Sequence, residues 1–221
     1  MRLLLTAALL CALLASAGGA AAGDDPFAAM LAPAGTCGAS DEQVNLDQST
    51  AQLVMTCLTN YARAQSSLKP LQLNATLNTA GSAKLAADVS CGVFSHEPCG
   101  KPFDSVFAAY TQGATSFQIG ENIAWGTGSY GTPRQIMSAW LHSSGHRENI
   151  LTPRFTEIGI GYLPNQAFLG YPGAALWSQQ FGTRTPASPA STAPASAPKP
   201  KKPGLKKKPV PRRKSAKLRA S

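Results

Sequence analysis

The chain has 221 residues, a formal net charge of +9 and five cysteines. Domains usually hold about 100–200 residues, so this length predicts one domain with further terminal segments. Beyond the first 22 residues, no apolar stretch approaches the ~20 residues that cross a bilayer. We therefore expect the chain not to be an integral membrane protein.

The first 22 residues have the three parts of a signal peptide. Arg2 supplies the positive start, Leu3 to Ala17 the apolar stretch, and Ala20-Ala21-Ala22 a cleavage site of small residues. That stretch is too short to span a bilayer. This segment predicts an exported, extracellular protein and argues against a cytosolic enzyme.

Four cysteines remain when Cys11 leaves with the signal peptide: Cys37, Cys57, Cys91 and Cys99. An even number in an exported chain predicts two disulfides, with three pairings open. We favour Cys37–Cys57 and Cys91–Cys99, which close the shortest loops. A four-cysteine zinc site is the rival interpretation, but the sequence has no C-x2-C pair. Residues 23–46 are polar and rich in small residues, and we expect an irregular arm there, held by Cys37.

Residues 47–182 carry the periodic apolar pattern of a folded domain. Helical spacing predicts helices over residues 49–65, from a cap at Asn74 to about residue 89, and over residues 103–110. Thr132-Pro133 starts a fourth helix, which we expect Gly145 to end. The inward-facing positions of these four helices are Leu53, Val54, Leu58, Tyr61, Leu77, Ala80, Leu85, Phe103, Val106, Phe107, Tyr110, Ile136, Met137, Trp140 and Leu141.

Two strands are predicted near the end of the domain, over residues 155–162 and 175–181. In the first, Ile158, Ile160 and Tyr162 alternate with glycine. Helices followed by strands with long connections favour the α+β class, although the composition does not specify the topology.

Three polar clusters contain the candidate functional residues His96, Glu121 and His146. A histidine and a carboxylate can perform acid–base chemistry, contribute to a divalent metal site, or satisfy each other in a buried polar network. The structural network is our leading interpretation, and the other two stay open. For Asn122 and Asn149, we expect backbone capping rather than contact with a substrate. His142 and His146 have a spacing that can bind zinc, but Gly145 lies between them.

The sequence has no G-x-S-x-G elbow, no phosphate-binding glycine loop and no H-E-x-x-H motif. If both disulfides form, no free cysteine remains to act as a nucleophile. These absences argue against the common hydrolase, kinase and thiol-protease mechanisms.

Five motifs in order resemble the CAP superfamily of cysteine-rich secretory proteins, insect venom allergens and plant pathogenesis-related proteins, and most closely its bacterial SCP-like branch. The resemblance covers roughly residues 37–182. The motifs are Phe94-Ser95-His96, Gly120-Glu121-Asn122-Ile123-Ala124-Trp125-Gly126, Trp140 with Ser143-x-Gly145-His146-Arg147-x-Asn149-Ile150-Leu151, Ile158-Gly159-Ile160-Gly161, and Gln180-Phe181-Gly182.

The resemblance implies a three-layer α-β-α sandwich with a central antiparallel sheet and a polar cleft. Family members generally place two histidines and two glutamates in that cleft, sometimes around a divalent cation such as zinc or magnesium. His96 and Glu121 match the first of each, whereas Ser143 and Leu176 stand near the other two positions. His146 is a further cleft candidate, and with His96 it is the candidate metal ligand. The family has been linked to lipid binding and to protease activity, so the cleft could take a lipid or small ligand.

The last segment, residues 183–221, differs from the domain. From Thr185 onward it contains eleven Lys/Arg and no acidic residue, whereas the rest of the chain is mildly acidic. A Pro/Ala-rich spacer comes first and the cations, in residues 199–219, follow; we expect both parts to be disordered. Such a tail predicts attraction to an anionic polymer or membrane surface without specific nucleic-acid recognition.

Three hypotheses follow. The first is a non-enzymatic ligand-binding or envelope-associated module held by its basic tail. The second is a hydrolase that uses Glu121 with His96 and His146, with or without a metal. The third is a polyanion-binding protein whose folded domain is only a carrier.

Overall fold

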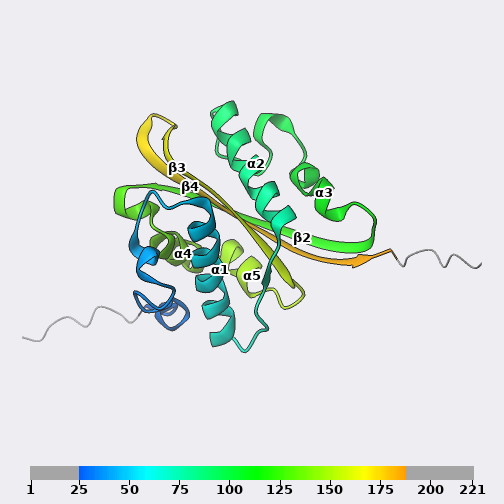
Figure 1. The fold of residues 1–221 in the computed structure, drawn as a ribbon, viewed down its shortest axis with the longest axis horizontal. Helices are drawn as coiled ribbons and strands as arrows, with labels where there is room; N and C mark the ends of the chain where they lie inside the picture. The colour runs from blue at the N-terminus through cyan, green and yellow to red at the C-terminus, as the bar shows by residue number, and fades with distance from the viewer. Residues whose placement is uncertain (1–24, 188–221) are drawn as a thin grey trace, which may run out of the picture. The chain divides into compact units, whose positions relative to one another are not determined.

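The computed structural model describes residues 25–187 of the chain. Five α-helices and four strands form the domain (Figure 1). The helices are α1 (Gln48–Gln65), α2 (Ala75–Cys91), α3 (Ala108–Thr111), α4 (Pro133–His142) and α5 (Ser144–Leu151). The strands are β1 (Gln72–Leu73), β2 (Ala114–Thr127), β3 (Glu157–Phe168) and β4 (Tyr171–Pro186). Short 3-10 turns are η1 (Ala28–Met30), η2 (Ala39–Glu42), η3 (Pro98–Gly100), η4 (Phe103–Phe107) and η5 (Gly128–Gly131).

The strands form one sheet in the order β1-β3-β4-β2. The three long strands run antiparallel, and the two-residue β1 pairs parallel with β3. Helices α2 and α3 cover one face of the sheet, and α1, α4 and α5 cover the other (Figure 1). The expected α+β sandwich of three layers is confirmed, with β1 as the only parallel strand among the described residues.

The alternation in β3 explains how the sheet fits between its two helical layers. Ile158, Ile160 and Tyr162 point into the main core, which they share with side chains of α1, α4 and α5. The intervening Gly159 and Gly161 face α2 instead. A Cβ atom at Gly159 would lie 2.0 Å from the carbonyl carbon of Leu77, so the backbone of α2 rests directly on the strand.

Most of the expected helices are confirmed. Asp47 caps α1, and the Asn74 side chain accepts hydrogen bonds from the N–H groups of Thr76 and Leu77 at the start of α2. Leu53 is an exception to the expected inward positions, because its side chain is 64% exposed. Residues 103–110 form a 3-10 turn that continues into the single turn of α3.

Two details of the fourth helix are corrected. The Thr132 hydroxyl donates to the carbonyl of Ser129 instead of capping α4. The helix ends at Ser143, whose backbone is extended, and Gly145 lies inside the next helix, α5. The break therefore comes two residues before the expected position.

The sheet is longer than expected. Strand β2 includes the polar segment from Gly120 to Gly126, which no strand prediction covered, because it pairs along its length with β4. Strand β4 continues to Pro186, beyond the expected domain boundary at residue 182, because Thr183 to Pro186 pair with the first residues of β2. The predicted signal peptide, residues 1–22, and the predicted tail from residue 188 onward lie outside the described residues.

Both favoured disulfides are present, Cys37–Cys57 and Cys91–Cys99. The first ties the N-terminal arm to α1, and the second closes a loop that follows α2. Over residues 25–187, the structure contains no helix long and apolar enough to pass through a membrane.

Candidate functional site

The candidate site lies where the loop after α2 meets the middle of β2. His96 is in the loop closed by the Cys91–Cys99 disulfide, and Glu121 is in the part of β2 that pairs with β4. The loop, the helix and the strand are separate in sequence, and the disulfide limits how far the loop can move from the sheet.

His96 and Glu121 form a direct pair. Their Nδ1 and Oε1 atoms are 2.7 Å apart, with the His96 side chain 51% exposed and the Glu121 side chain fully buried. The second carboxylate oxygen, Oε2, accepts a hydrogen bond of 2.8 Å from the Gln180 side chain. An ionised carboxylate can only accept, so the His96 Nδ1–H donates to Oε1, and Nε2 is the ring nitrogen that Glu121 does not engage.

Two charged residues of α2 complete the site, and sequence reasoning missed both. Lys84 is only 1% exposed, and its Nζ atom lies 3.3 Å from Asp88 Oδ1 and 3.8 Å from Glu121 Oε1. Lys84 also donates to the backbone carbonyl of Ser95, the residue before His96. Burial raises the pKa of Asp88, whereas the Lys84 charge opposes that rise. A lysine and an aspartate four residues apart were the available signal, since such a pair sits on one face of a helix.

His146 lies beside this pair but does not join its hydrogen bonds. Burial lowers its pKa, and the nearby His96 charge lowers it further. Its Nδ1 atom is buried without a hydrogen-bond partner among the described residues. The backbone carbonyl of His146 accepts from the Asn122 side chain, so the main chain of α5 is fixed at this point.

Asn122 and Asn149 hold α5 against β2. The Asn149 amide donates to the backbone carbonyl of Glu121 and to Asn122 Oδ1, and Asn122 donates to Gln179 Oε1. Both asparagines donate to backbone carbonyls, but these bonds connect a helix to a strand, whereas the prediction was backbone capping. The network orients the strand that carries Glu121.

His142 lies away from the site. Its ring contacts the backbone carbonyl of Ser138 and the carboxylate of Asp25, and those contacts raise its pKa. The pairing of His142 with His146 as two zinc ligands is therefore not formed, because α4 ends between them and directs the two side chains to different neighbours.

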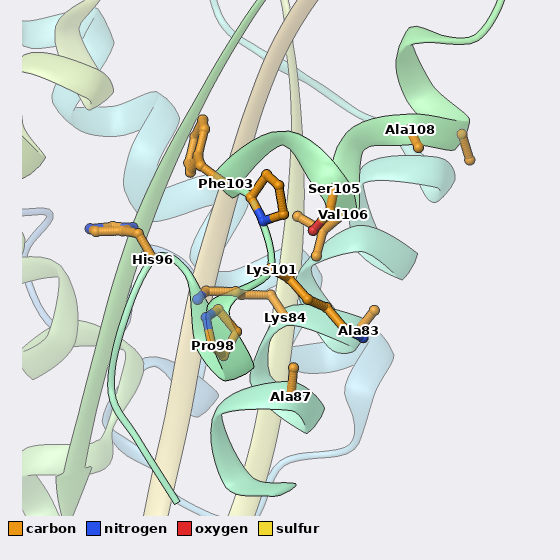
Figure 2. A pocket seen from close by; sticks show the side chains of 12 residues that line it. Ala83, Lys84, Ala87, His96, Pro98, Lys101, Phe103, Ser105, Val106 and Ala108 are labelled. Carbon is orange, nitrogen blue, oxygen red and sulfur yellow. The ribbon is translucent and has the colours of Figure 1, made fainter. Parts of the chain in front are cut away.

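A cavity of about 390 Å³ borders the site (Figure 2). It lies between α2 and the η3–α3 segment, and Lys84 extends across it toward the side where His96 lies. The walls are formed mainly by small or apolar side chains, among them Ala83, Ala87, Pro98, Pro102, Phe103, Val106, Ala108 and Ala109. A second hollow of about 300 Å³ continues along α2 and shares three lining residues, Ala83, Val106 and Ala109, with the first. Together they form one apolar trough.

The charged residues that line the trough, Lys84 and Lys101, are both cationic. Lys101 and His96 lie at its edge and no acidic residue lines it. Lys101 has no ion-pair partner among the described residues. Lys84, by contrast, is already neutralised by Asp88 and Glu121.

The residues present do not fit the divalent cation that the resemblance implied. Among residues 25–187, no three His, Cys, Asp or Glu side chains gather as metal ligands. Leu176, near the position of the second histidine, is buried in an apolar cluster. The Lys84 ammonium, 3.8 Å from Glu121 Oε1, repels a cation at that carboxylate. His96 and His146 are therefore poor candidates for a zinc or magnesium site.

Comparison with known proteins agrees with this fold. The family model described as CAP, the cysteine-rich secretory protein family, matches residues 57–181, so the chain belongs to this family. Over 126 residues it is 38% identical to the Bacillus subtilis (strain 168) "Uncharacterized protein YkwD", a match that covers 56% of this chain and 44% of YkwD. Over 123 residues it is 28% identical to that organism's "Uncharacterized membrane protein YlbC", a match that covers 55% of this chain and 34% of YlbC. The chain thus spans less than half the length of either relative.

A solved structure shows the same fold. An outer surface protein from Borrelia burgdorferi has a TM-score of 0.53 and 18% sequence identity, over 63% of this chain and 97% of the Borrelia chain. At that identity the likeness concerns the fold alone.

Proposed function

We propose that this protein is an exported, non-enzymatic binding module that holds an amphiphilic ligand in the trough beside His96 and associates with the cell envelope. The trough carries the proposal: its walls are apolar, Lys101 supplies a cation with no ion-pair partner among the described residues, and no acidic residue lines it. An aliphatic chain gains free energy from burial against such walls, and an anionic head group would pair with Lys101. The signal peptide and the outer-surface description of the Borrelia protein support the location.

Dodecanoate is a suitable probe, with dodecanol and dodecyltrimethylammonium as comparators of matched chain length. We expect calorimetry to rank dodecanoate first and the cationic amphiphile last. Replacing Lys101 with glutamate should reduce the preference for dodecanoate. Equal binding of all three amphiphiles would contradict the role of charge, and binding of none would contradict the proposal.

Two alanines of α2 provide a matched pair of variants. Ala83 lines both parts of the trough, whereas Ala86 is an exposed residue of the same helix that lines neither. Ala83→Phe should weaken dodecanoate binding by roughly tenfold or more, because the ring occupies space that the chain needs. Ala86→Phe should leave binding unchanged, and equal losses in the two variants would place the ligand elsewhere.

The basic tail supplies the proposed attachment to the envelope. Its eleven cations would each contribute up to ~1 kcal/mol near an anionic surface, so retention on anionic vesicles or cell wall should fall as salt increases. Deleting residues 188–221 leaves every strand of the sheet intact and should abolish this retention. If the deleted form is retained equally well, the tail is not the attachment; if the tail peptide alone reproduces all binding, the domain is only a carrier.

A second candidate function is hydrolysis, favoured by the 2.7 Å contact between His96 and Glu121. A carboxylate that orients an imidazole can make its free Nε2 a general base toward water. Peptide and ester substrates, tested with and without added zinc or magnesium, would reveal such activity. We expect none in the wild type; turnover that disappears in His96→Asn would replace the binding proposal with an enzyme.

A further inference from the structure

An apolar patch lies at one end of the sheet, beside the loop that carries His96. The β3–β4 hairpin turns through Leu169 and Gly170, and its tip extends beyond the helices in Figure 1. Leu169 is 46% exposed and Tyr171 is 55% exposed. Phe94, which is 40% exposed, packs edge-on against Phe168 of the same hairpin.

Aromatic contacts make this tip a defined surface. Trp125, at the end of β2, contacts Phe168 edge-on and lies 5.3 Å from Tyr171 between ring centroids. The exposed rings are therefore supported from behind by other rings. We call Phe94, Trp125, Phe168, Leu169 and Tyr171 the hairpin patch.

The segments that form the hairpin patch carry no charge. No Asp, Glu, Lys or Arg occurs from Val89 to Ser95, from Asn122 to Pro133, or from Ile158 to Thr183. Exposed apolar side chains scattered singly are normal on a protein surface, whereas a contiguous group indicates an interaction site. An uncharged, ring-bearing turn is suited to the interfacial region of a bilayer, where Trp and Tyr are enriched.

We propose that the hairpin patch inserts into the interface of a lipid bilayer and acts as the apolar half of a two-part membrane attachment. This inference rests on the envelope association proposed above and adds the surface that touches the membrane. The sequence supplies the electrostatic half in the eleven cations after Thr185. Stable attachment at a membrane surface generally needs two such signals, because one apolar group or one basic segment binds weakly and reversibly.

The patch and the trough are close along the chain. Phe94 belongs to the hairpin patch, and His96, two residues later, lines the trough. A domain docked through the patch would hold the loop between them near the lipid surface. The membrane would then be the source of the amphiphile that the trough binds.

Tryptophan emission offers a local test in the full chain. The other two tryptophans of the sequence, Trp140 and Trp177, are fully buried, so short-range quenching by lipids brominated on the acyl chain reports on Trp125. With anionic vesicles, we expect brominated lipid to quench the emission and Trp125→Phe to remove the quenching while binding continues. Vesicle binding without quenching would overturn the proposal.

A pair of variants separates the patch from the tail. Leu169→Ser with Tyr171→Ser removes exposed apolar surface from the patch, and Leu53→Ser removes it from α1, where Leu53 is 64% exposed. At about 1 M salt, where the Debye length is ~3 Å, the patch variant should partition into vesicles roughly tenfold less than wild type, and Leu53→Ser should match wild type. Equal partitioning of all three would overturn the proposal.

The same vesicles distinguish this proposal from the role of the tail. Loss of low-salt binding on deletion of residues 188–221, with Trp125 still quenched at high lipid concentration, supports both. Quenching without any effect of the deletion supports the patch and contradicts the tail. A shift of the Trp125 emission on binding of a neutral cell-wall glycan, with no quenching by brominated vesicles, would assign the patch to another partner and overturn the membrane proposal.

Discussion

Lys84 of α2 and Glu121 of β2 approach each other between the helix and the sheet, with 3.8 Å between Nζ and Oε1, and both side chains are buried. Asp88 supplies a second carboxylate 3.3 Å from the same ammonium. Buried ions are costly unless they are paired, so one lysine stabilises two carboxylates. The same ammonium holds the Ser95 carbonyl, which connects the charge balance of the core to the loop of His96.

Replacing Lys84 with methionine should therefore destabilise the protein strongly. The variant leaves Asp88 and Glu121 buried without their counter-charge, and breaking a buried pair in this way costs about 3–5 kcal/mol. Urea unfolding would measure the loss. Adding Asp88→Leu should restore part of the stability because it removes one unpaired carboxylate. Lys69→Met, at an exposed position, should change stability by no more than about 0.5 kcal/mol, and an equal effect of the two lysine substitutions would contradict the prediction.

Protonation of the buried His146 should lower the stability of the protein at acid pH. Its folded-state pKa is below the ordinary 6.5 because of burial and the His96 charge. The stability that the neutral ring contributes is thus fully present above pH 6.5 and is lost as the pH falls through the lowered pKa. In His146→Leu, the urea midpoint should fall less than in wild type over this acid range.

The exposed His142 serves as a control of opposite sign. Its contacts with Ser138 and Asp25 raise its pKa. Its contribution is therefore present below pH 6.5 and is lost as the pH rises through the raised pKa. If His142→Leu and His146→Leu changed the pH dependence in the same direction, the assignment of the two environments would be wrong.

Two glycines should respond to alanine in opposite ways. Gly159→Ala places a Cβ atom 2.0 Å from the backbone of Leu77, and we expect a loss of roughly 3 kcal/mol, in the upper part of the range for overpacking. Gly145 lies inside α5 with no atom within 4 Å of an added Cβ, so Gly145→Ala should gain about 0.5–1 kcal/mol. Thermal unfolding of both variants checks the signs, and a stable Gly159→Ala would refute the close packing of α2 on β3.

Removing each of the two disulfides should lower the stability of the protein by a different amount and should affect a different region. Removing either as a double Cys→Ser variant typically costs about 2–4 kcal/mol. Cys37–Cys57 closes a longer loop, with a sequence separation of 20 against 8, and should cost roughly 0.8 kcal/mol more in the chain-entropy account. Hydrogen exchange should increase around Ser95 and His96 only when Cys91 and Cys99 are replaced. Faster exchange there in both variants would contradict a separate role for the short loop.

Much of the fold was predictable because local patterns agreed with the packing. Alternation of isoleucine and glycine predicted β3, and the Asn74 cap predicted where α2 begins. The pattern could not predict β2, since Glu121 and Asn122 are polar residues of the kind that usually mark loops. Their burial depends on Gln180, Gln179 and Asn149, which lie far away in the sequence.

The site was predictable only in part, for the same reason. The resemblance indicated His96 and Glu121, and the structure pairs them. Lys84 and Asp88 were hidden because charged residues of a helix are usually solvated. Only the approach of the Ser95 carbonyl and of Glu121 shows that this face of α2 is buried. The local sequence likewise predicted that α4 ends at Gly145. In the structure the helix ends at His142, and the backbone of Ser143 is extended.

The Cys91–Cys99 disulfide also affects when His96 is held in place beside Glu121. Glu121 is fixed by the sheet, whereas its partner His96 sits on a small covalent ring that closes only by oxidation. Reducing surroundings keep the two thiols unpaired, so a chain folded there would hold the His96 loop only through the Glu121 contact and the Lys84–Ser95 hydrogen bond. An oxidising compartment would then restrict this loop and favour the His96–Glu121 contact.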